Sequence, residues 1–378
     1  MHLMNTYKRL PVRFVRGEGV YLYDDKGKRY LDMLAGIAVN ALGYKDPELT
    51  QAICNQAKEL LHISNLFENP WQEELAKELV EEFWTSGKVF FCNSGAEANE
   101  GAIKLVRKFF YERGEKRYRI ITFYNSFHGR TFGSMSATAQ EKIQRGFEPL
   151  LDGFDYAELN NFDSVLKALK KDTAGIMLEV IQGEGGIREA DFEFMQRIQE
   201  LCKREGLLLI VDEVQTGIGR TGKFYAYQHY NVEPDIITLA KGLGGGVPIG
   251  AILARDEVAD AFGPGSHGST FGGNPLACAS AKVVVRRVKK LLVQVERVGS
   301  YFKRKLEELK VGKVRGKGLM LGLELERDCS QIVQKALERG LVINCTSERV
   351  LRFVPPLIIE ERHVDEAVEI LREVLTQA

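Results

Sequence analysis

The chain has 378 residues, of which 44% are hydrophobic and 28% are charged, and its 52 basic residues balance its 52 acidic ones. These values are ordinary for a soluble globular protein, and the length exceeds what one hydrophobic core usually needs, so we expect two domains. Because the net charge is zero, composition gives no support for a nucleic-acid or membrane partner. A small-molecule substrate is the remaining expectation.

The N-terminal sequence and the cysteines predict a cytoplasmic protein. The opening "MHLMNTYKRLPVRF" has no apolar core of signal-peptide length, and no run approaches the ~18 apolar residues that span a bilayer. The six cysteines form no CxxC pair, and no histidine pair has zinc-ligand spacing. We therefore expect reduced, mostly buried thiols and no structural metal.

The first elements in chain order are a hairpin and a helical stretch, followed by alternating strands and helices. The segment "GEGVYLYDDKGKRYLDMLAGIAVNALG" alternates apolar and polar residues around Asp25–Lys26–Gly27, which indicates a β-hairpin. The pattern from residue 48 to 84 is helical, and further helices are predicted up to Tyr111 and from Phe192 to Glu205. Short apolar strands between helices indicate an α/β unit with a largely parallel, buried sheet: "KVFFCNS", "RIITFYN", "AGIMLEV", "LLLIVDE", "DIITLA" and "IGAILA".

The pattern changes after "STFGGNPLAC", where long helical stretches precede the segments "ALERGLVINCT" and "VLRFVPPL". We interpret this part as a smaller α+β domain that includes the N-terminal hairpin. The predicted division is an N-terminal segment, 1–45, that joins the small domain, a large ligand-binding domain, 46–270, and a C-terminal small domain, 271–378.

The segment "FCNSGAEANEGAIKLVRKFF" predicts a strand that leads into a helix. Ser94 with Glu97 three residues later has the pattern of a capping box. A helix cap alone would explain this pattern. However, Gly95 and Ala96 have almost no side chain, so an anion can approach their backbone N–H groups at the positive end of the helix dipole. A phosphate would fit there.

Two further strands end in residues that could carry chemistry. Asp212 closes the apolar run of "LLLIVDEVQTGIGRTG", and Lys241 closes that of "DIITLAKGLGGGVPIGAILA". Open α/β sheets bind ligands at the carboxyl ends of their strands. A buried acid at that position needs a cationic or hydrogen-bonding partner, although Asp212 could also cap a helix. Burial would lower the pKa of the Lys241 amine and make it a nucleophile toward an aldehyde.

Two alternatives to a reactive Lys241 remain at this point. The side chain could extend to solvent along an apolar surface. The glycines after it faintly resemble a dinucleotide-binding loop, but Pro248 interrupts the segment and no helix of good formers follows. In contrast, an anion-binding helix start, an acid and a lysine are together what pyridoxal phosphate needs. The helix start would hold the phosphate, the acid would keep the pyridine nitrogen protonated, and Lys241 would form the Schiff base.

With these residues, the sequence resembles the class III pyridoxal-phosphate aminotransferases of fold type I. The resemblance implies an α/β fold with a mostly parallel sheet of the seven-stranded type in the large domain, and a homodimer with shared active sites. The resemblance covers nearly the whole chain. It rests on these segments, given in chain order: "GIAVNALGY", "SNLFENP", "NSGAEANEGAIKLVRK", "FHGRTFGSMSATA", "LEVIQGEGG", "VDEVQTGIGRTG", "AKGLGGGVPIGA", "HGSTFGGNPLAC" and "RFVPPL".

The resemblance implies roles for the residues that would bind the cofactor. Lys241 would be the Schiff-base lysine and would move the proton, and Asp212 would bond the pyridine nitrogen. The others would contact the ring or the phosphate: Ser94, Gly95 and Ala96 at the phosphate, Phe127 stacked on the ring, Val214 and Gln215 beside it, and Thr270 at the phosphate of the neighbouring subunit's cofactor.

The resemblance also implies residues for the substrates. Arg130 would clamp the α-carboxylate, since a bidentate guanidinium suits a planar carboxylate, and Ser269 would help to hold the acylated amino acid. Glu184 and Arg352 would form a switch pair. They would neutralise each other when the ω-amino donor binds, and Arg352 would be freed for the second carboxylate of glutamate or 2-oxoglutarate. The alternative for both is an ordinary surface charge.

The expected reaction is a ping-pong transamination from N2-acetyl-L-ornithine to 2-oxoglutarate. Other ω-amines stay open as donors, namely ornithine, succinylornithine, 4-aminobutyrate and a carrier-linked lysine precursor. The segment at 36–44, with Asn40 and Ala41, leaves room for an acyl tail and favours the acetylated donor. Two more distant alternatives are an aminomutase, which would not need the Glu184–Arg352 switch, and a catalytically silent cofactor-binding relative.

Overall fold

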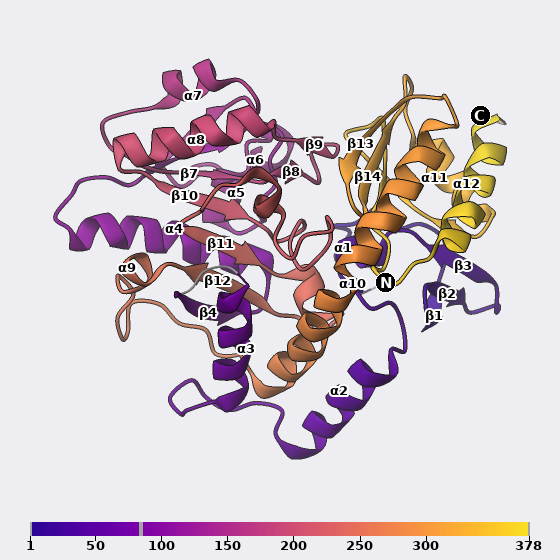
Figure 1. The fold of residues 1–378 in the computed structure, drawn as a ribbon, viewed down its shortest axis with the longest axis horizontal. Coiled ribbons are helices and arrows are strands. Elements are labelled where there is room, and N and C mark those ends of the chain that lie inside the picture. The colour runs from indigo at the N-terminus through magenta and orange to yellow at the C-terminus, as the bar shows by residue number, and fades with distance from the viewer. Residues whose placement is uncertain (1, 83–85, 377–378) are drawn as a thin grey trace.

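A seven-stranded sheet organises the larger part of the chain, seen on the left of Figure 1. The computed structural model describes residues 2–82 and 86–376. β12 is antiparallel to both of its neighbours, and all other neighbours are parallel, so the predicted mostly parallel sheet is confirmed. The spatial order is β4 (Lys88–Cys92), β12 (Gly250–Ala254), β11 (Ile236–Leu239), β10 (Leu208–Asp212), β7 (Thr173–Leu178), β5 (Arg119–Phe123) and β6 (Phe154–Ala157).

Helices cover both faces of this sheet because its central strands are apolar on both sides. Ile210 packs in one core cluster with residues of α4 (Gly95–Glu112), and Val211 packs in the other with residues of α8 (Phe192–Glu205). Successive residues of a strand point to opposite faces. The continuous apolar runs of the sequence therefore result from burial on two sides, and α8 has the predicted bounds.

The predicted helical stretch 48–84 is interrupted. The structure has two helices, α2 (Pro47–Glu59) and α3 (Pro70–Glu81), and the expected end at 83–84 lies outside the described residues. Asn69 caps α3 through a hydrogen bond from the N–H of Gln72, and the proline that follows it begins the helix. Proline is suited to the first helical position and breaks a helix interior, so the predicted helical pattern corresponds to two helices here.

Shorter elements connect the sheet strands and frame the site. They are α5 (Phe132–Ala137), α6 (Glu141–Gln144), α7 (Phe162–Ala168), α9 (Asp256–Ala259), the 3₁₀ helices η1 (Ala226–Tyr230) and η2 (Lys241–Gly244), and the hairpin of β8 (Ile181–Gln182) with β9 (Arg188–Glu189).

The N-terminal hairpin pairs with a strand from the C-terminal part of the chain. β3 (Arg29–Asp32) pairs with β2 (Tyr21–Asp24) on one side and with β15 (Leu341–Val342) on the other, and β1 (Phe14–Glu18) completes this sheet. This pairing supports the proposed three-part division, whose boundaries at 45 and 270 stay a prediction. The second small sheet has the order β13 (Lys313–Lys317), β14 (Met320–Glu324), β17 (Val350–Phe353), β16 (Asn344–Thr346).

The long helix α10 (Pro275–Glu307) links the two parts, and it runs between them in Figure 1. It packs against α2, α3 and η2, and further along against β13 and α12 (Glu361–Thr376). None of the described helices combines the length and the apolar character that a membrane span requires.

A left-handed turn, labelled α1 (Ala35–Ala38), follows β3 and leads toward the site. All four residues have positive φ, including Ile37 at 67°. Left-handed backbone is unfavourable for residues with a Cβ. The buried carboxylate of Asp32 holds the start of the turn, because its Oδ1 accepts the N–H groups of Leu34 and Ala35, both at 2.9 Å.

The expectation of six reduced thiols was wrong. Cys329, directly before α11 (Ser330–Glu338), forms a disulfide with Cys345 in β16. The two residues are 16 positions apart, and only the packing of α11 against β16 brings them together. The remaining cysteines are free, and Cys92, Cys202 and Cys278 are buried whereas Cys54 is exposed.

Candidate active site

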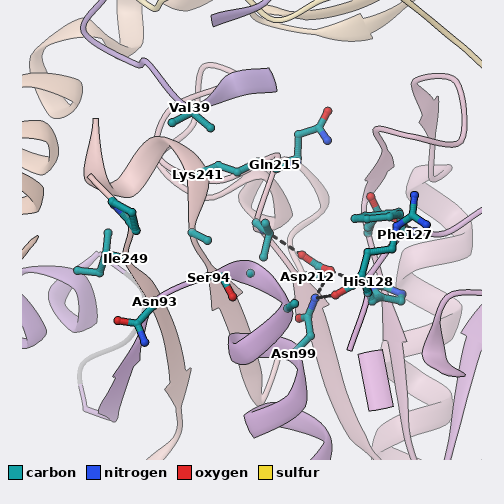
Figure 2. A pocket seen from close by; sticks show the side chains of 18 of the residues that line it. Val39, Asn93, Ser94, Asn99, Phe127, His128, Asp212, Gln215, Lys241 and Ile249 are labelled. Atoms are coloured by element: carbon teal, nitrogen blue, oxygen red, sulfur yellow. Dashed lines mark hydrogen bonds and ion pairs between the residues drawn. The ribbon is translucent and has the colours of Figure 1, made fainter. Parts of the chain in front are cut away.

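The carboxyl ends of the parallel strands lie at a pocket of about 410 Å³. β5, β7, β10, β11 and β4 run in the same direction, so the residues that follow them meet at one edge of the sheet. The pocket is lined by nine residues that the sequence predicted: Ser94, Gly95, Ala96, Phe127, Arg130, Asp212, Val214, Gln215 and Lys241. Figure 2 shows the side chains of Phe127, Asp212, Gln215 and Lys241 around this space.

Lys241 enters the pocket just beyond the end of β11, with Ala240 between them, as the first residue of η2. Its backbone has a φ of 42°, which is rare for a residue with a side chain. Burial lowers the pKa of its amine, and the nearby charge of Glu184 only partly opposes this. Within the described residues, no carboxylate lies within ion-pair distance of Lys241 Nζ. An amine of this kind is suited to nucleophilic and proton-transfer chemistry.

Asp212 has the hydrogen-bonding partners that its burial requires. Its Oδ2 accepts from Asn99 Nδ2 at 2.8 Å and lies 2.7 Å from His128 Nδ1, and its Oδ1 accepts from the N–H of Val214. Burial by itself lowers the pKa of His128. The hydrogen bond and the charge of Asp212 outweigh the effect of burial, so the pKa of His128 is raised above its ordinary value. These hydrogen bonds hold the carboxylate in one orientation at the pocket (Figure 2).

Asn99 and His128 are site residues that sequence analysis missed. Asn99 also donates to the carbonyl of His128 at 2.7 Å and accepts from the hydroxyl of Thr238 at 2.7 Å. Both residues stood within quoted motifs, "GAEANEGA" and "FHGR". The available signal was the requirement that Asp212 have a polar partner, but the sequence could not say which polar residue would fold onto it.

The start of α4 differs from the expected capping box by one residue. Ser94 Oγ accepts from the N–H of Glu97, as predicted, but the Glu97 carboxylate accepts from the N–H of Asn93 rather than from that of Ser94. In the part of the chain that the structure describes, no protein acceptor takes the N–H of Gly95 or Ala96. A Cβ on Gly95 would lie 2.6 Å from Val214 Cγ1, so only glycine fits there.

Phe127 is held at the pocket by Glu179, a third residue that the sequence did not single out. Glu179 Oε1 accepts from the N–H of Phe127 at 2.9 Å, and its Oε2 accepts from the N–H of Gly183 at 3.3 Å. Burial raises the pKa of this carboxyl to about 7. Arg130 lies over the ring of Phe127, with its guanidinium carbon 5.7 Å from the ring centre, and is exposed toward the opening.

Glu184 and Arg352 are 168 residues apart in sequence and form an ion pair beside the pocket, with Arg352 Nη1 at 2.6 Å from Glu184 Oε1. Arg352 is completely buried, and its Nη1 also lies 3.3 Å from Gln215 Oε1. Burial would raise the pKa of Glu184, but Arg352 outweighs this and holds it below its ordinary value. Within the described residues, Arg352 Nη2 is buried without a partner.

Ser269 and Thr270 do not line this pocket. Ser269 Oγ accepts from Asn93 Nδ2 at 3.3 Å and from the N–H of Gly272, and Thr270 is exposed on the surface. Neither position is thus placed against the site of its own chain. The predicted contact of Thr270 with a neighbouring subunit remains a prediction.

The chemistry of the donor set matches pyridoxal phosphate. The unused N–H groups of Gly95 and Ala96 at the start of α4 suit a phosphate. Asp212 suits a protonated pyridine nitrogen, and Lys241 suits an aldehyde. The aromatic face of Phe127 and the side chain of Val214 line the space between these groups. The pocket therefore has a protein group suited to the phosphate, to the ring nitrogen and to the aldehyde of the cofactor.

A fold of this type with a lysine, an acid and an anion-binding helix start at one sheet edge defines a pyridoxal-phosphate transferase. The family model "Aminotransferase class-III" matches residues 3–375. The chain belongs to the class III aminotransferases, which use pyridoxal phosphate, so the expected family, fold and cofactor are confirmed.

Relatives within this family carry more particular names. The acetylornithine aminotransferase of Aquifex aeolicus is 64% identical over 374 residues, which covers 99% of this chain and 100% of that protein. The crystal structure of N-acetylornithine aminotransferase from Stenotrophomonas maltophilia has a TM-score of 0.86 at 39% identity, over 98% of this chain and 97% of that one. An ornithine aminotransferase structure from Toxoplasma gondii, with partial occupancy of PLP at its active site, has a TM-score of 0.94 at 34% identity, over 100% and 92%.

Proposed function

We propose that this chain transfers the terminal amino group of N2-acetyl-L-ornithine to 2-oxoglutarate, which gives N-acetyl-L-glutamate 5-semialdehyde and L-glutamate. The observation that carries the proposal is the Glu184–Arg352 pair beside Lys241. A buried guanidinium with one partnered and one unpartnered terminal nitrogen suits an enzyme that must accept a second carboxylate in only one of two half-reactions. The names of the relatives at 64% and 39% identity support the acetylated donor.

Each residue of the site has its own role in the proposed reaction. Pyridoxal phosphate, when bound, supplies the carbonyl group that takes up the amine and the ring that accepts the electrons of the broken C–H bond. Lys241 Nζ would remove the proton from the carbon that bears the donor amine in the first half-reaction, and in the second it would deliver a proton to the carbon of 2-oxoglutarate that receives the amine. Asp212, oriented by His128 and Asn99, stabilises the protonated ring nitrogen. Arg130 at the opening binds the α-carboxylate of the donor.

The switch pair accounts for two substrates in one pocket. When the donor binds through its neutral methylene chain, Glu184 neutralises Arg352 so that no unpaired buried cation remains. When 2-oxoglutarate or glutamate binds, Glu184 swings away and Arg352 pairs with the second carboxylate, for which Nη2 is already available. An aminomutase needs no such exchange, so this pair disfavours that alternative.

The proposal includes a homodimer with shared sites and a place in arginine biosynthesis. Thr270 and Phe271 are exposed next to a buried loop segment, which supports a role toward a second copy. Sedimentation of the purified protein with pyridoxal phosphate should give the mass of two chains, and a single-chain mass would contradict the shared site. The cytoplasmic location also stays a prediction.

Initial rates with four donors test the substrate. N-Acetylornithine, ornithine, succinylornithine and 4-aminobutyrate are each measured against 2-oxoglutarate. We expect the highest kcat/KM for N-acetylornithine, because Arg130 binds its α-carboxylate while the acyl group removes the competing α-amine. A higher kcat/KM for another of the four would reject this donor and retain the transaminase.

A further inference from the structure

Strand β16 and the residue that follows it place three side chains against the switch pair. Asn344 Oδ1 accepts from Arg352 Nε at 3.1 Å, so it fixes one side of the guanidinium. Thr346 Oγ1 donates to the backbone carbonyl of Glu184 at 2.6 Å, and Ser347 Oγ donates to the same oxygen at 3.3 Å. One short segment of the small domain therefore holds both members of a pair that belongs to two different parts of the chain.

Cys345 lies between Asn344 and Thr346 in the sequence, and its disulfide links this segment to α11. Cys329 is completely buried at the start of that helix, and its N–H donates to the carbonyl of Glu348 at 2.9 Å. α11 packs in turn against α12 and β15. The disulfide thus anchors 344–347 to α11, which is itself packed into the small domain.

Cys345 also faces the route to the site. A cavity of about 470 Å³ is lined by Cys345 together with Arg130, Glu184 and Phe127. Small molecules that enter the substrate opening can therefore reach the disulfide. The bond is positioned both to stabilise the switch segment and to be broken by a reductant from solvent.

We propose that residues 344–347, anchored through the Cys329–Cys345 disulfide, are a positioning element that holds Glu184 and Arg352 in their paired arrangement and so sets the balance between the two substrates. Thr346 fixes the backbone from which the Glu184 side chain extends, and Asn344 fixes the guanidinium that it must reach. The inference rests on the proposed function for the identity of the substrates, but not for the mechanical role of the segment.

Breaking the disulfide should favour the unpaired arrangement. A small dithiol supplies two electrons and two protons to the bond, which leaves thiols on Cys329 and Cys345 and converts the dithiol to its own disulfide. The ω-amino donor needs the paired arrangement, so its KM should rise about fivefold, the effect of one lost hydrogen bond. The KM for 2-oxoglutarate, which needs the unpaired arrangement, should stay the same or fall.

Thiol counting and hydrogen exchange test the element without reference to activity. Under denaturing conditions the protein should show four free thiols per chain without reductant and six after reduction. Reduction, or the double variant Cys329→Ala/Cys345→Ala, should speed backbone hydrogen exchange in peptides that cover 181–189 and 344–349. Six thiols in the untreated protein, or unchanged exchange in both peptides, would overturn the proposal.

Steady-state kinetics of the same samples test the effect on the two substrates. Thr346→Val is a second variant, which keeps the disulfide and removes only the hydrogen bond from the Thr346 hydroxyl to the Glu184 carbonyl. Both variants should raise the KM for N-acetylornithine relative to that for 2-oxoglutarate. Cys54→Ser, at an exposed free cysteine, is the matched control and should leave the ratio unchanged. Equal changes in the two KM values would overturn the proposal, because a general loss of folded structure would affect the binding of both substrates alike.

The two proposals fail in different ways. A wild-type enzyme that does not use N-acetylornithine, but whose 181–189 exchange depends on the disulfide, rejects the proposed donor and supports the positioning role. If the wild-type enzyme uses N-acetylornithine, but its hydrogen exchange and its KM ratio do not change when the disulfide is broken, the positioning role is rejected and the proposed donor is supported.

Discussion

At the scale of single residues, the buried charged groups of the site differ in whether they have a defined partner. Asp212 is held by Asn99 and His128, and Arg352 is held by Glu184. Lys241, in contrast, is crowded by protein, has a lowered pKa and makes no ion pair within the described residues. Burial that would be costly for a structural lysine is what makes this amine reactive at moderate pH.

Lys241→Ala should abolish turnover by removing the group that moves the proton. We expect kcat to fall by at least ~10²–10⁴-fold, and the visible absorbance that the lysine-linked cofactor gives should disappear. Absorbance spectra and initial rates measure both effects. Lys58→Ala, at an exposed position of α2, serves as the control and should retain colour and rate. A variant at 241 that kept normal turnover would refute the assignment.

Glu184→Gln should separate the two half-reactions. The substitution removes the charge that neutralises Arg352, so the donor must bind beside an unpaired buried cation, and its KM should rise by about tenfold, or ~1.4 kcal/mol. The KM for 2-oxoglutarate should change little, because its own carboxylate pairs with Arg352. Glu189→Gln, in the same hairpin but paired with Lys317, is the matched control for steady-state kinetics. A parallel rise in both KM values would argue against the switch.

At the scale of elements, helix starts and strand ends position the chemistry. α4 begins at the anion-binding residues, η2 begins at Lys241, and the left-handed turn α1 brings Val39 to the pocket wall. α10 joins these elements to the small domain, and its start is fixed by Asn274, whose side chain accepts from the N–H of Ala277 at 2.9 Å. Caps at such junctions therefore contribute to stability and to the alignment of the two parts.

Asn274→Ala should destabilise the protein by about 1 kcal/mol, because the substitution leaves an N–H at the start of α10 without its partner. Thermal or denaturant unfolding measures this loss. Asn55→Ala, at an exposed position within α2, should change the free energy of unfolding by no more than about 0.5 kcal/mol. If the two variants were equally stable, the cap would not be a stabilising contact.

At the scale of the whole molecule, the active site is assembled from distant parts of the chain. The cofactor residues come from the seven-stranded sheet, Arg352 comes from β17 in the small domain, and Val39 comes from the N-terminal region. Two buried carboxyls, Glu179 and Glu213, directly follow β7 and β10 of this sheet, and burial raises the pKa of each to about 7. Stability should therefore depend on pH through groups far from the surface.

Glu213 offers a direct test of this pH dependence. Its pKa is raised in the folded state, so its contribution to stability is present below the unfolded value of about 4.5 and is lost as pH rises through about 7. Relative to Glu213→Gln, which does not titrate, the wild-type protein should lose up to about 3 kcal/mol between pH 4.5 and 7.5. Denaturant unfolding of both proteins at the two pH values measures the difference, and a constant difference would contradict the shift.

The sequence by itself determined the class of the fold and the cofactor end of the site. Apolar runs that end in Ser94, Asp212 and Lys241 predict adjacent strand ends, because parallel strands share one carboxyl edge. That inference needs only local pattern and one rule of topology, and the pocket brings these residues together.

Only the tertiary structure decided the contacts that depend on folding over long separations. The pairing of Asp212 with His128, the closing of Glu184 onto Arg352 and the disulfide between Cys329 and Cys345 each join segments from different elements. The sequence limits which residue types can satisfy a buried charge or thiol, but several candidates of each type exist along the chain. Packing of the small domain against the sheet selects among them.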